Sequence, residues 1–298
     1  MKLRVSHLTR YEYSHEVEFS PHTLYLKPRE QSSLRLLNFT LNVNPNAKVV
    51  RTRDAADNPV VLAWFWDRSN VLSIRNEFEV ETLESNPFDF IVHHHAFKFP
   101  FEYIAEEAFV LSPFMAPPFE DTRRRLTNWL DEHFTERPVE TVPFLTALNT
   151  LVHQTLTYVR RDERGIQPSV QTLDLATGSC RDYAVLFIEI CRTLGLAARF
   201  SSGYVYNPPA ESGEANAMET SSLTQGGATM HAWAEVYIPG AGWKGLDPTY
   251  DMWCADAHIP VAVAAEAETV SPVQGAYYSP NAISSVLHTD VLVERLSD

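Results

Sequence analysis

Three residues of the chain have the side chains used in cysteine-dependent nucleophilic catalysis: Cys180, His231 and Asp247. A thiolate attacks a carbonyl carbon, an imidazole gives and takes the proton, and a carboxylate fixes the orientation of the imidazole. The same residue types also occur singly for structural reasons. The chemistry is therefore expected only if the surrounding segments bring the three side chains within hydrogen-bond reach.

Cys180 lies in the segment ATGSCRDYAVLF, residues 176–187, where a helix is predicted to begin. Ser179 can cap this helix, and Asp182 completes the Ser-x-x-Asp form of a capping box. The unpaired N–H groups and the helix dipole in the first turn favour an anion, and the thiolate is the nucleophilic form of cysteine. Cys191 lies on the same stripe in mid-helix and is interpreted as a small core residue.

His231 and Asp247 lie in the segment MHAWAEVYIPGAGWKGLDPTYD, which predicts two strands joined by a Pro/Gly turn. A hairpin centred on Pro239 would set His231 directly opposite Asp247 on one face, with Cβ atoms roughly 4.5–5.5 Å apart. A slip of one residue in register would separate them. In this arrangement Asp247 would accept the Nδ1–H of the imidazole and leave Nε2 to face the thiol of Cys180.

The elements around these residues divide the chain into two parts. The first part alternates apolar and polar residues, or is rich in β-branched and aromatic residues, which predicts the strands of a β-sandwich or barrel. These strand-like stretches are LRVSHLTRYEYS, LLNFTLNVNP, PVVLAWFW and NVLSIRNEFEVETL. Prolines then crowd residues 87–118, so we predict a β-rich domain at residues 1–110 and a second domain at residues 111–298.

The second part has helical periodicity in three segments, residues 121–134, 141–156 and 179–195, with Thr141 as the expected cap of the second helix. Strand-like segments follow in AARFSSGYVY, MHAWAEVYI, GWKGLDPTYD and SSVLHTDVLVERL. The predicted fold class is therefore α+β, with the cysteine-bearing helix packed on an antiparallel sheet. Residues 207–228 are rich in Gly, Ser and Ala and predict a mobile loop.

Composition excludes several classes of partner. The chain has 298 residues with 38 acidic and 24 basic side chains, and its formal net charge of −14 disfavours nucleic acid and anionic membranes. No segment approaches the roughly 18–20 apolar residues needed to span a bilayer, and no secretory signal is expected. Three widely spaced cysteines form neither a disulfide framework nor a zinc pattern, so a reducing, cytoplasmic setting is expected.

The quoted segments resemble the transglutaminase-like superfamily of papain-related Cys-His-Asp enzymes. GSCRDYAVLFIEICRTLGLAARFSSGYVY is similar to the nucleophile helix and following strand of the family, and HAWAEVYIPGAGWKGLDPT is similar to its histidine and aspartate strands. The first part of the chain resembles the β-domain that precedes this core in bacterial members. The resemblance implies Cys180 as nucleophile, His231 as general base and acid, and Asp247 as the orienting residue, with no cofactor and no metal.

The resemblance also implies a thioester on Cys180, formed from a peptide or side-chain amide. Water would give hydrolysis, as in a cysteine protease, and an amine would give crosslinking; hydrolysis is slightly favoured. The Cys180 backbone N–H and one side-chain donor would hold the carbonyl oxygen, with Gln167 and Gln171 as candidates that could equally be surface residues. Trp233 and Trp243 are candidate walls of the cleft, although packing is the more expected role.

Two other functions stay open. A transglutaminase-like core could bind peptides without turning them over, but the intact Cys-His-Asp set argues against this. A zinc hydrolase could be built around the histidines of residues 93–95, but the chain lacks an HExxH or CxxC arrangement, and solvent exposure of the tract is the favoured interpretation. We therefore expect a peptide or protein amide as the partner, with no nucleic acid and no membrane. The sequence does not indicate the oligomeric state.

Overall fold

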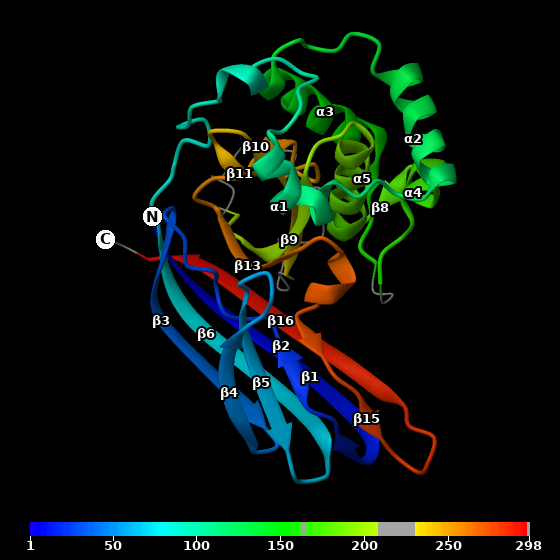
Figure 1. Cartoon of the computed structure of the whole chain (residues 1–298). Coiled ribbons are helices and arrows are strands. Elements are labelled where there is room, and N and C mark those ends of the chain that lie inside the picture. The colour runs from blue at the N-terminus through cyan, green and yellow to red at the C-terminus, as the bar shows by residue number, and fades with distance from the viewer. Residues whose placement is uncertain (162–164, 208–229, 297–298) are drawn as a thin grey trace, which may run out of the picture.

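The computed structural model describes residues 1–161, 165–207 and 230–296, so the predicted loop at residues 207–228 lies almost wholly outside the described residues. Figure 1 shows two stacked regions, a long β region below and a helical region with its own sheet above. This arrangement confirms the predicted α+β fold class with a β-rich first part. Among the described residues, no helix is long and apolar enough to cross a membrane.

The β region is a sandwich of two antiparallel sheets. One sheet has the order β15–β1–β6–β3, with β16 also paired to β1, and the other has the order β14–β2–β5–β4. The strands are β1 (Lys2–Phe19), β2 (His22–Leu24), β3 (Leu34–Asn44), β4 (Ala47–Arg53), β5 (Pro59–Phe65), β6 (Ser69–Thr82), β14 (Val273–Gln274), β15 (Tyr277–Tyr278) and β16 (Ser285–Arg295).

Period-two alternation explains how β1 and β6 pack. Val5 lies opposite Phe78, and both side chains are buried. The next pair along the strands, Arg4 and Glu79, points outward and forms an ion pair of 2.8 Å. Since successive side chains point to opposite faces, one register buries the whole apolar set of both strands.

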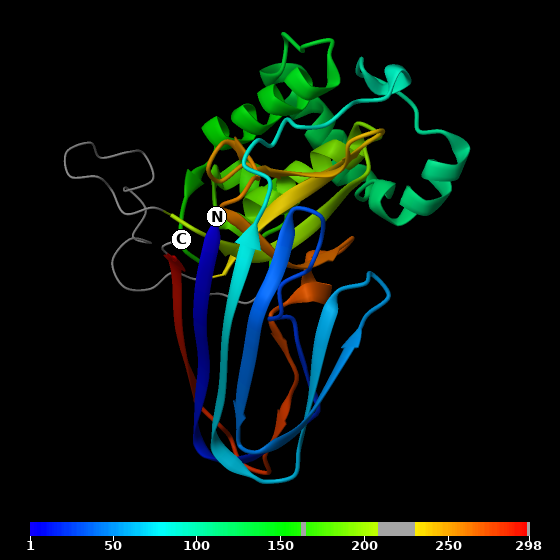
Figure 2. The same ribbon diagram turned by 90° about the vertical axis from the view of Figure 1, so that its left-hand side faces the viewer.

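The last strand, β16, pairs with the first strand, β1. β16 pairs antiparallel with β1 from Leu3 opposite Arg295 to Tyr13 opposite Ser285, so β1 lies between β16 and β6 (Figure 2). β14 and β15 likewise pair with β2 and β1. The chain therefore divides differently from the predicted 111–298 domain, because residues 273–295 complete the sandwich. Alternation predicts a strand here but does not encode which distant strand it joins.

The upper region has an antiparallel sheet of order β12–β11–β10–β9–β13 covered by helices. Its strands are β9 (Ala198–Val205), β10 (His231–Ile238), β11 (Gly242–Asp247), β12 (Met252–Trp253) and β13 (His258–Ala264), and a short parallel pair is formed by β7 (Thr157–Tyr158) and β8 (Thr177–Gly178). Its helices are α1 (Ala105–Met115), α2 (Glu120–His133), α3 (Thr141–Thr155), α4 (Ser169–Leu175) and α5 (Cys180–Thr193), with 3₁₀ turns at His94–Ala96 and Ala267–Val270.

The three predicted helices are present as α2, α3 and α5, and α1 and α4 were not predicted. α1 contains Pro113, which lacks the N–H of a helix interior and obscured the pattern. α4 has seven residues, too few for a periodic signal. Thr141 is not the cap of α3: Glu140 holds that position, and the Thr141 hydroxyl donates to the carbonyl oxygen of Ala96.

α5 packs its predicted stripe against the sheet. Ala184, Phe187 and Cys191 are fully buried, and they share one apolar core with Ala232 and Ala234 of β10. These small alanine side chains let the helix approach the sheet closely. The opposite face of β10 carries larger residues toward the β region. α5 therefore rests on the strand that begins with His231.

Buried polar pairs join the two regions. The Asn58 side chain donates to the carbonyl oxygen of Val263 and accepts from its N–H, both at 2.8 Å. His7 Nδ1 lies 2.8 Å from the Tyr204 hydroxyl. Polar groups without water must find partners inside the protein, so these contacts fix the positions of β9 and β13 relative to the sandwich.

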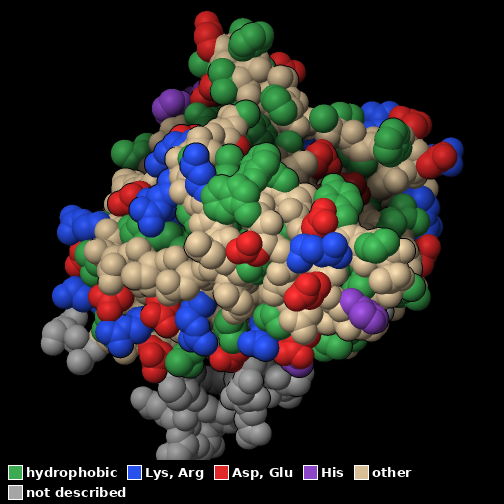
Figure 3. Space-filling view, turned by 90° about the horizontal axis from the view of Figure 1, so that it is seen from below, with side chains coloured by type: hydrophobic (Ala, Val, Ile, Leu, Met, Phe, Trp, Pro, Cys, Tyr) green, Lys and Arg blue, Asp and Glu red, His purple; other side chains and the backbone are tan. Residues whose placement is uncertain are grey.

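Charges on the outer surface are mixed. Figure 3 shows acidic and basic side chains interspersed over the face seen from below. Several of the exposed charges are close partners, for example Arg68 and Glu18 at 3.6 Å. Exposed pairs of this kind contribute little to stability.

Candidate active site

The start of α5 is built as the sequence predicts. Ser179 is the N-cap, and its N–H and hydroxyl both donate to Oδ2 of Asp182 at 2.8 Å. Burial raises the pKa of Asp182, but hydrogen bonds from Arg161, Gln167 and Ser179 outweigh it and lower that pKa overall. Asp182 is fully buried, so these donors fix the first turn that carries Cys180.

His231 begins β10 and Asp247 ends β11, and Nε2 of the imidazole lies 2.7 Å from Oδ2 of the carboxylate. The predicted direct opposition of the two residues is wrong. Ala234 pairs with Leu246, and extending this register places Asp247 opposite Trp233. A shift of two residues keeps both side chains on one face, so they meet diagonally.

The imidazole is turned the other way from the expected arrangement. Asp247 holds Nε2 of His231, which leaves Nδ1 as the nitrogen available to the Cys180 thiol, whose charge helps to raise the pKa of the imidazole. Cys180 is 8% exposed and Asp247 is fully buried. The three side chains therefore lie close together, with His231 hydrogen-bonded to Asp247 and its pKa influenced by the charge of Cys180.

The electrostatic interactions among these three side chains favour a protonated imidazole. Burial lowers the pKa of His231, but the charges of Asp247 and Cys180, and hydrogen bonds with both, raise it well above its ordinary value. Burial raises the pKa of Asp247, and the charge and hydrogen bond of His231, aided by His258, hold it well below its ordinary range. An imidazolium beside the Asp247 carboxylate is therefore the favoured charge state of this pair.

His258 was not singled out from the sequence, yet it shares Asp247 with His231. Its Nε2 lies 3.1 Å from Oδ2 of Asp247, and the N–H of Thr249 donates to Oδ1 at 3.0 Å. His258 opens β13, and it faces Val205 of β9 rather than a strand adjacent in sequence. No strand was predicted at this element, and only the order of strands in the sheet brings it to the site.

Two tyrosines border the imidazole and the thiol. Tyr250 stacks on His231 with ring centroids 5.1 Å apart. Burial raises the pKa of Tyr158, and the charges of Cys180 and Tyr250 raise it further. Tyr158 lies on the two-residue strand β7, too short to give a sequence signal.

The side-chain amide of Gln167 is already engaged and is not available as the predicted oxyanion donor. Gln167 donates its backbone N–H to Asp182, and its side-chain amide donates to the Thr172 hydroxyl and the Thr177 carbonyl at 3.0 and 2.9 Å. Both amide hydrogens are thus used to support the start of α5. Gln171 is exposed on α4.

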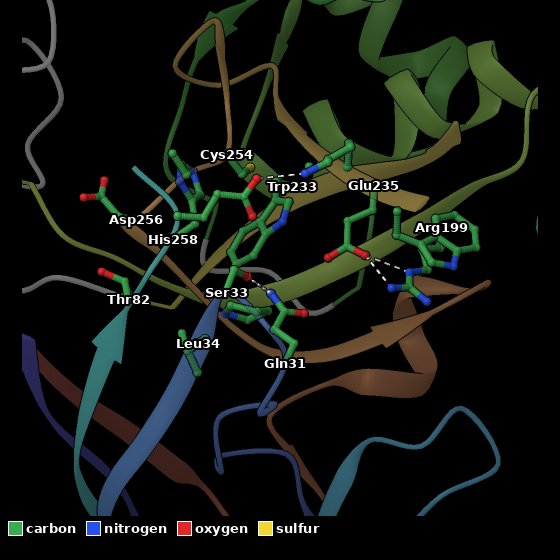
Figure 4. A pocket seen from close by; sticks show the side chains of 16 residues that line it. Gln31, Ser33, Leu34, Thr82, Arg199, Trp233, Glu235, Cys254, Asp256 and His258 are labelled. Atoms are coloured by element: carbon green, nitrogen blue, oxygen red, sulfur yellow. Dashed lines mark hydrogen bonds and ion pairs between the residues drawn. The ribbon is translucent and has the colours of Figure 1, made fainter. Parts of the chain in front are cut away.

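The two tryptophans have different neighbours. Trp233 is 2% exposed and packs beside His231 and His258, with ring centroids 6.2 and 5.2 Å away. Trp243 lies under the Arg199 guanidinium at 4.1 Å. Both line a polar pocket between the two regions (Figure 4). The pocket lining includes neither Cys180 nor His231, so this placement favours packing over a wall of the reactive cleft.

The remaining cysteines and histidines show no comparable arrangement. Cys191 is fully buried, and burial raises the pKa of its thiol. Burial, with the charges of Asp247 and Glu235, also raises the pKa of Cys254 well above its ordinary value. The histidines of residues 93–95 are exposed, and no group of three or more His, Cys, Asp or Glu in the described part of the chain could hold a metal ion.

Comparison with known proteins covers both regions. Residues 121–248 match the transglutaminase-like superfamily, and residues 3–81 match the bacterial transglutaminase-like N-terminal region. Uncharacterized proteins of Mycobacterium bovis and Mycobacterium tuberculosis are each 27% identical over 304 residues, covering 97% of this chain and 91% of the relative. A solved structure, a "Putative Cysteine Protease" from Cytophaga hutchinsonii, has a TM-score of 0.72 at 17% identity, covering 100% of this chain and 92% of that one. This likeness extends the shared fold over both regions.

Proposed function

Residues 121–248 belong to the transglutaminase-like superfamily, and on this basis we propose that the chain is a cysteine-dependent amide hydrolase or acyltransferase. The proposal rests on one observation, the grouping of Cys180 at the start of α5 with the hydrogen-bonded pair of His231 and Asp247. We assign Cys180 as nucleophile, His231 as acid and base, and Asp247 as the residue that orients the imidazole.

The first half-reaction forms a thioester. The Cys180 thiolate attacks the amide carbonyl carbon, and a C–S bond forms while the oxygen becomes an oxyanion. The Cys180 backbone N–H, in the first turn where helix donors lack intrahelical partners, is placed to stabilise that oxyanion. The C–N bond then breaks as His231 gives its Nδ1 proton to the leaving amine.

The second half-reaction releases the acyl group. The neutral His231 takes a proton from water, the resulting hydroxide adds to the thioester carbonyl, and the C–S bond breaks. The products are a carboxylic acid and the original thiolate–imidazolium pair. An amine in place of water would give a new amide.

We favour hydrolysis over amine transfer. Water reaches any open thioester, whereas transfer also requires a bound amine beside Cys180. The structural neighbour from Cytophaga hutchinsonii is described as a "Putative Cysteine Protease", and a protease activity would also be hydrolysis. Its likeness to this chain is a likeness of fold. The substrate class in this proposal is a peptide bond or a side-chain amide in a peptide or protein.

Two measurements test the proposal. A peptide library, presented to the wild type and to Cys180→Ala, should show mass changes that depend on Cys180. A fluorescent primary amine added to the same reactions distinguishes the outcomes: a new carboxylic acid indicates hydrolysis, and a fluorescent peptide indicates transfer. Peptides that bind but are unchanged by the wild type would contradict catalysis and favour the peptide-binding alternative.

The proposal includes a reducing, cytoplasmic setting. All three cysteines are free thiols, and the nucleophile must stay reduced to act. Fractionation of cells that produce the chain tests this, since recovery outside the cytoplasm would contradict the location without affecting the assigned chemistry.

A further inference from the structure

The carboxylate of Asp247 has hydrogen-bond partners in addition to His231. Its Oδ2 lies 2.7 Å from Nε2 of His231 and 3.1 Å from Nε2 of His258, while Oδ1 accepts the N–H of Thr249. The carboxylate is fully buried, so every interaction that holds its charge and its plane comes from these groups. Two imidazoles therefore meet at one carboxylate oxygen.

His258 is itself held firmly. It is 5% exposed, and its ring packs edge-on against Trp233 with centroids 5.2 Å apart. Its backbone N–H donates to Ala255, and β13 joins it to β9. Figure 4 shows the ring at the polar pocket between the two regions, close to Cys254 and Asp256. The side chain has little freedom to leave Asp247.

The tautomer of His258 follows from its surroundings. Among the described residues, its Nδ1 is buried and has no hydrogen-bond partner. A proton on Nδ1 alone would be buried without an acceptor, and Nε2 would then present a lone pair to the anionic oxygen of Asp247. The neutral ring therefore carries its proton on Nε2 and donates it to Asp247.

We propose that His258 is a positioning residue of the reactive site, which fixes the carboxylate of Asp247 so that Nδ1 of His231 faces Cys180. His258 acts through Asp247 and touches neither the thiol nor a substrate. Without its donor, the carboxylate could rotate and present Oδ1 or Oδ2 to His231 in several geometries. This inference rests on the proposed function, since it assigns a further residue to the same chemistry.

Two substitutions separate donation from packing. His258→Gln places an amide N–H near the position of Nε2 but loses the ring, whereas His258→Phe keeps a ring against Trp233 and loses the donor. A positioning role predicts that the Phe variant loses on the order of 10-fold in kcat with KM unchanged, while the Gln variant stays within about 3-fold of the wild type. A packing role predicts the reverse order.

A second readout does not need an amide substrate. The rate of Cys180 alkylation by iodoacetamide at about pH 6 reports the thiolate that the His231 imidazolium holds. We expect the Phe variant to react several-fold more slowly than the wild type and the Gln variant to react nearly as fast. Thermal melts establish that each variant is folded, and His258→Leu replaces the Phe variant if that variant unfolds.

The outcomes distinguish the two proposals. If wild-type Cys180 reacts no faster than the same residue in the denatured chain, the proposed function fails. If wild-type Cys180 reacts fast and the Phe variant equals it, the positioning role is overturned while the proposed function stands. Equal losses in the Gln and Phe variants also overturn it, because donation would then not matter.

Discussion

The first turn and the middle of α5 each carry a cysteine on the same stripe of the same helix. Cys191 is enclosed by the apolar core, and burial raises the pKa of its thiol. Cys180 borders the same core but lies at a capped helix start, close enough to His231 for its charge to raise the pKa of the imidazole. Position relative to a helix end and to one imidazole, rather than residue type or burial alone, distinguishes the proposed nucleophile from a packing residue.

The largest expected difference between the two sites is in turnover. Cys180→Ala should abolish hydrolysis or transfer of an amide substrate and keep the fold, because it removes the only atom that forms the thioester. Cys191→Ala is the matched control and should retain activity. Turnover assays with thermal melts measure both, and a folded Cys180→Ala variant with full activity would rule out the mechanism.

His231→Ala should cost about 10³-fold in kcat/KM, since it removes the partner of the thiolate and the acid for the leaving amine. His288, exposed on β16, provides a control through His288→Ala, which should be neutral. Kinetics on one amide substrate check both variants. Activity of His231→Ala close to the wild type would mean that the imidazole near Cys180 has no chemical role.

Asp247→Asn should cost between about 10-fold and 10³-fold, less than His231→Ala. The amide keeps the shape of the carboxylate but no longer stabilises the imidazolium, and it can hold the wrong tautomer. Asp290→Asn on β16 changes the same charge at a distant exposed position and should be neutral. The prediction is the order of the losses in activity. A larger loss for Asp247→Asn than for His231→Ala would contradict an orienting role.

Alkylation compares the two thiols directly. Iodoacetamide at neutral pH should modify Cys180 on the order of 100-fold faster than Cys191. The rate should remain high below pH 8, because the raised pKa of His231 keeps the imidazolium beside the thiolate there; amide turnover should fall as pH rises through that raised pKa. Peptide mapping of the modified protein identifies the site, and preferential labelling of Cys191 would reverse the comparison.

The smallest effect concerns stability rather than chemistry. Asp182→Asn should lower the free energy of unfolding by about 2–4 kcal/mol, because it breaks a buried ion pair with Arg161 and weakens the cap of α5. The pKa of Asp182 is lowered by folding, so its contribution is present above the ordinary aspartate pKa and is lost as pH falls through the folded value. Urea unfolding at neutral and acidic pH tests this, and a pH-independent difference would argue against the ion pair.

The sequence predicts those features that depend on neighbouring residues. The capping box at Ser179, the stripe of α5 and the strands around His231 all follow from local patterns, and all are present. The register of β10 and β11 differs by two residues from the prediction because Gly240, at a positive φ of 90°, makes a tighter turn centred one position later than Pro239.

Features that depend on distant residues were not predictable in this way. His258 reaches Asp247 because β13 lies beside β9, and β16 joins β1 across almost the whole chain. The orientation of the His231 ring depends on which nitrogen Asp247 meets, a torsional choice that strand alternation leaves undetermined. Sheet order and side-chain rotamers thus separate the predicted site from the observed one.

The pairing of β16 with β1 also determines when the first sheet can be completed during synthesis. β6 reaches β1 early in synthesis, but the other edge of β1 stays without its partner until the whole helical region has left the ribosome. An unpaired edge of this length is a template for pairing with other chains. The nascent protein must therefore carry an open β edge through most of its translation, and the first strand to be synthesised is among the last to be fully paired.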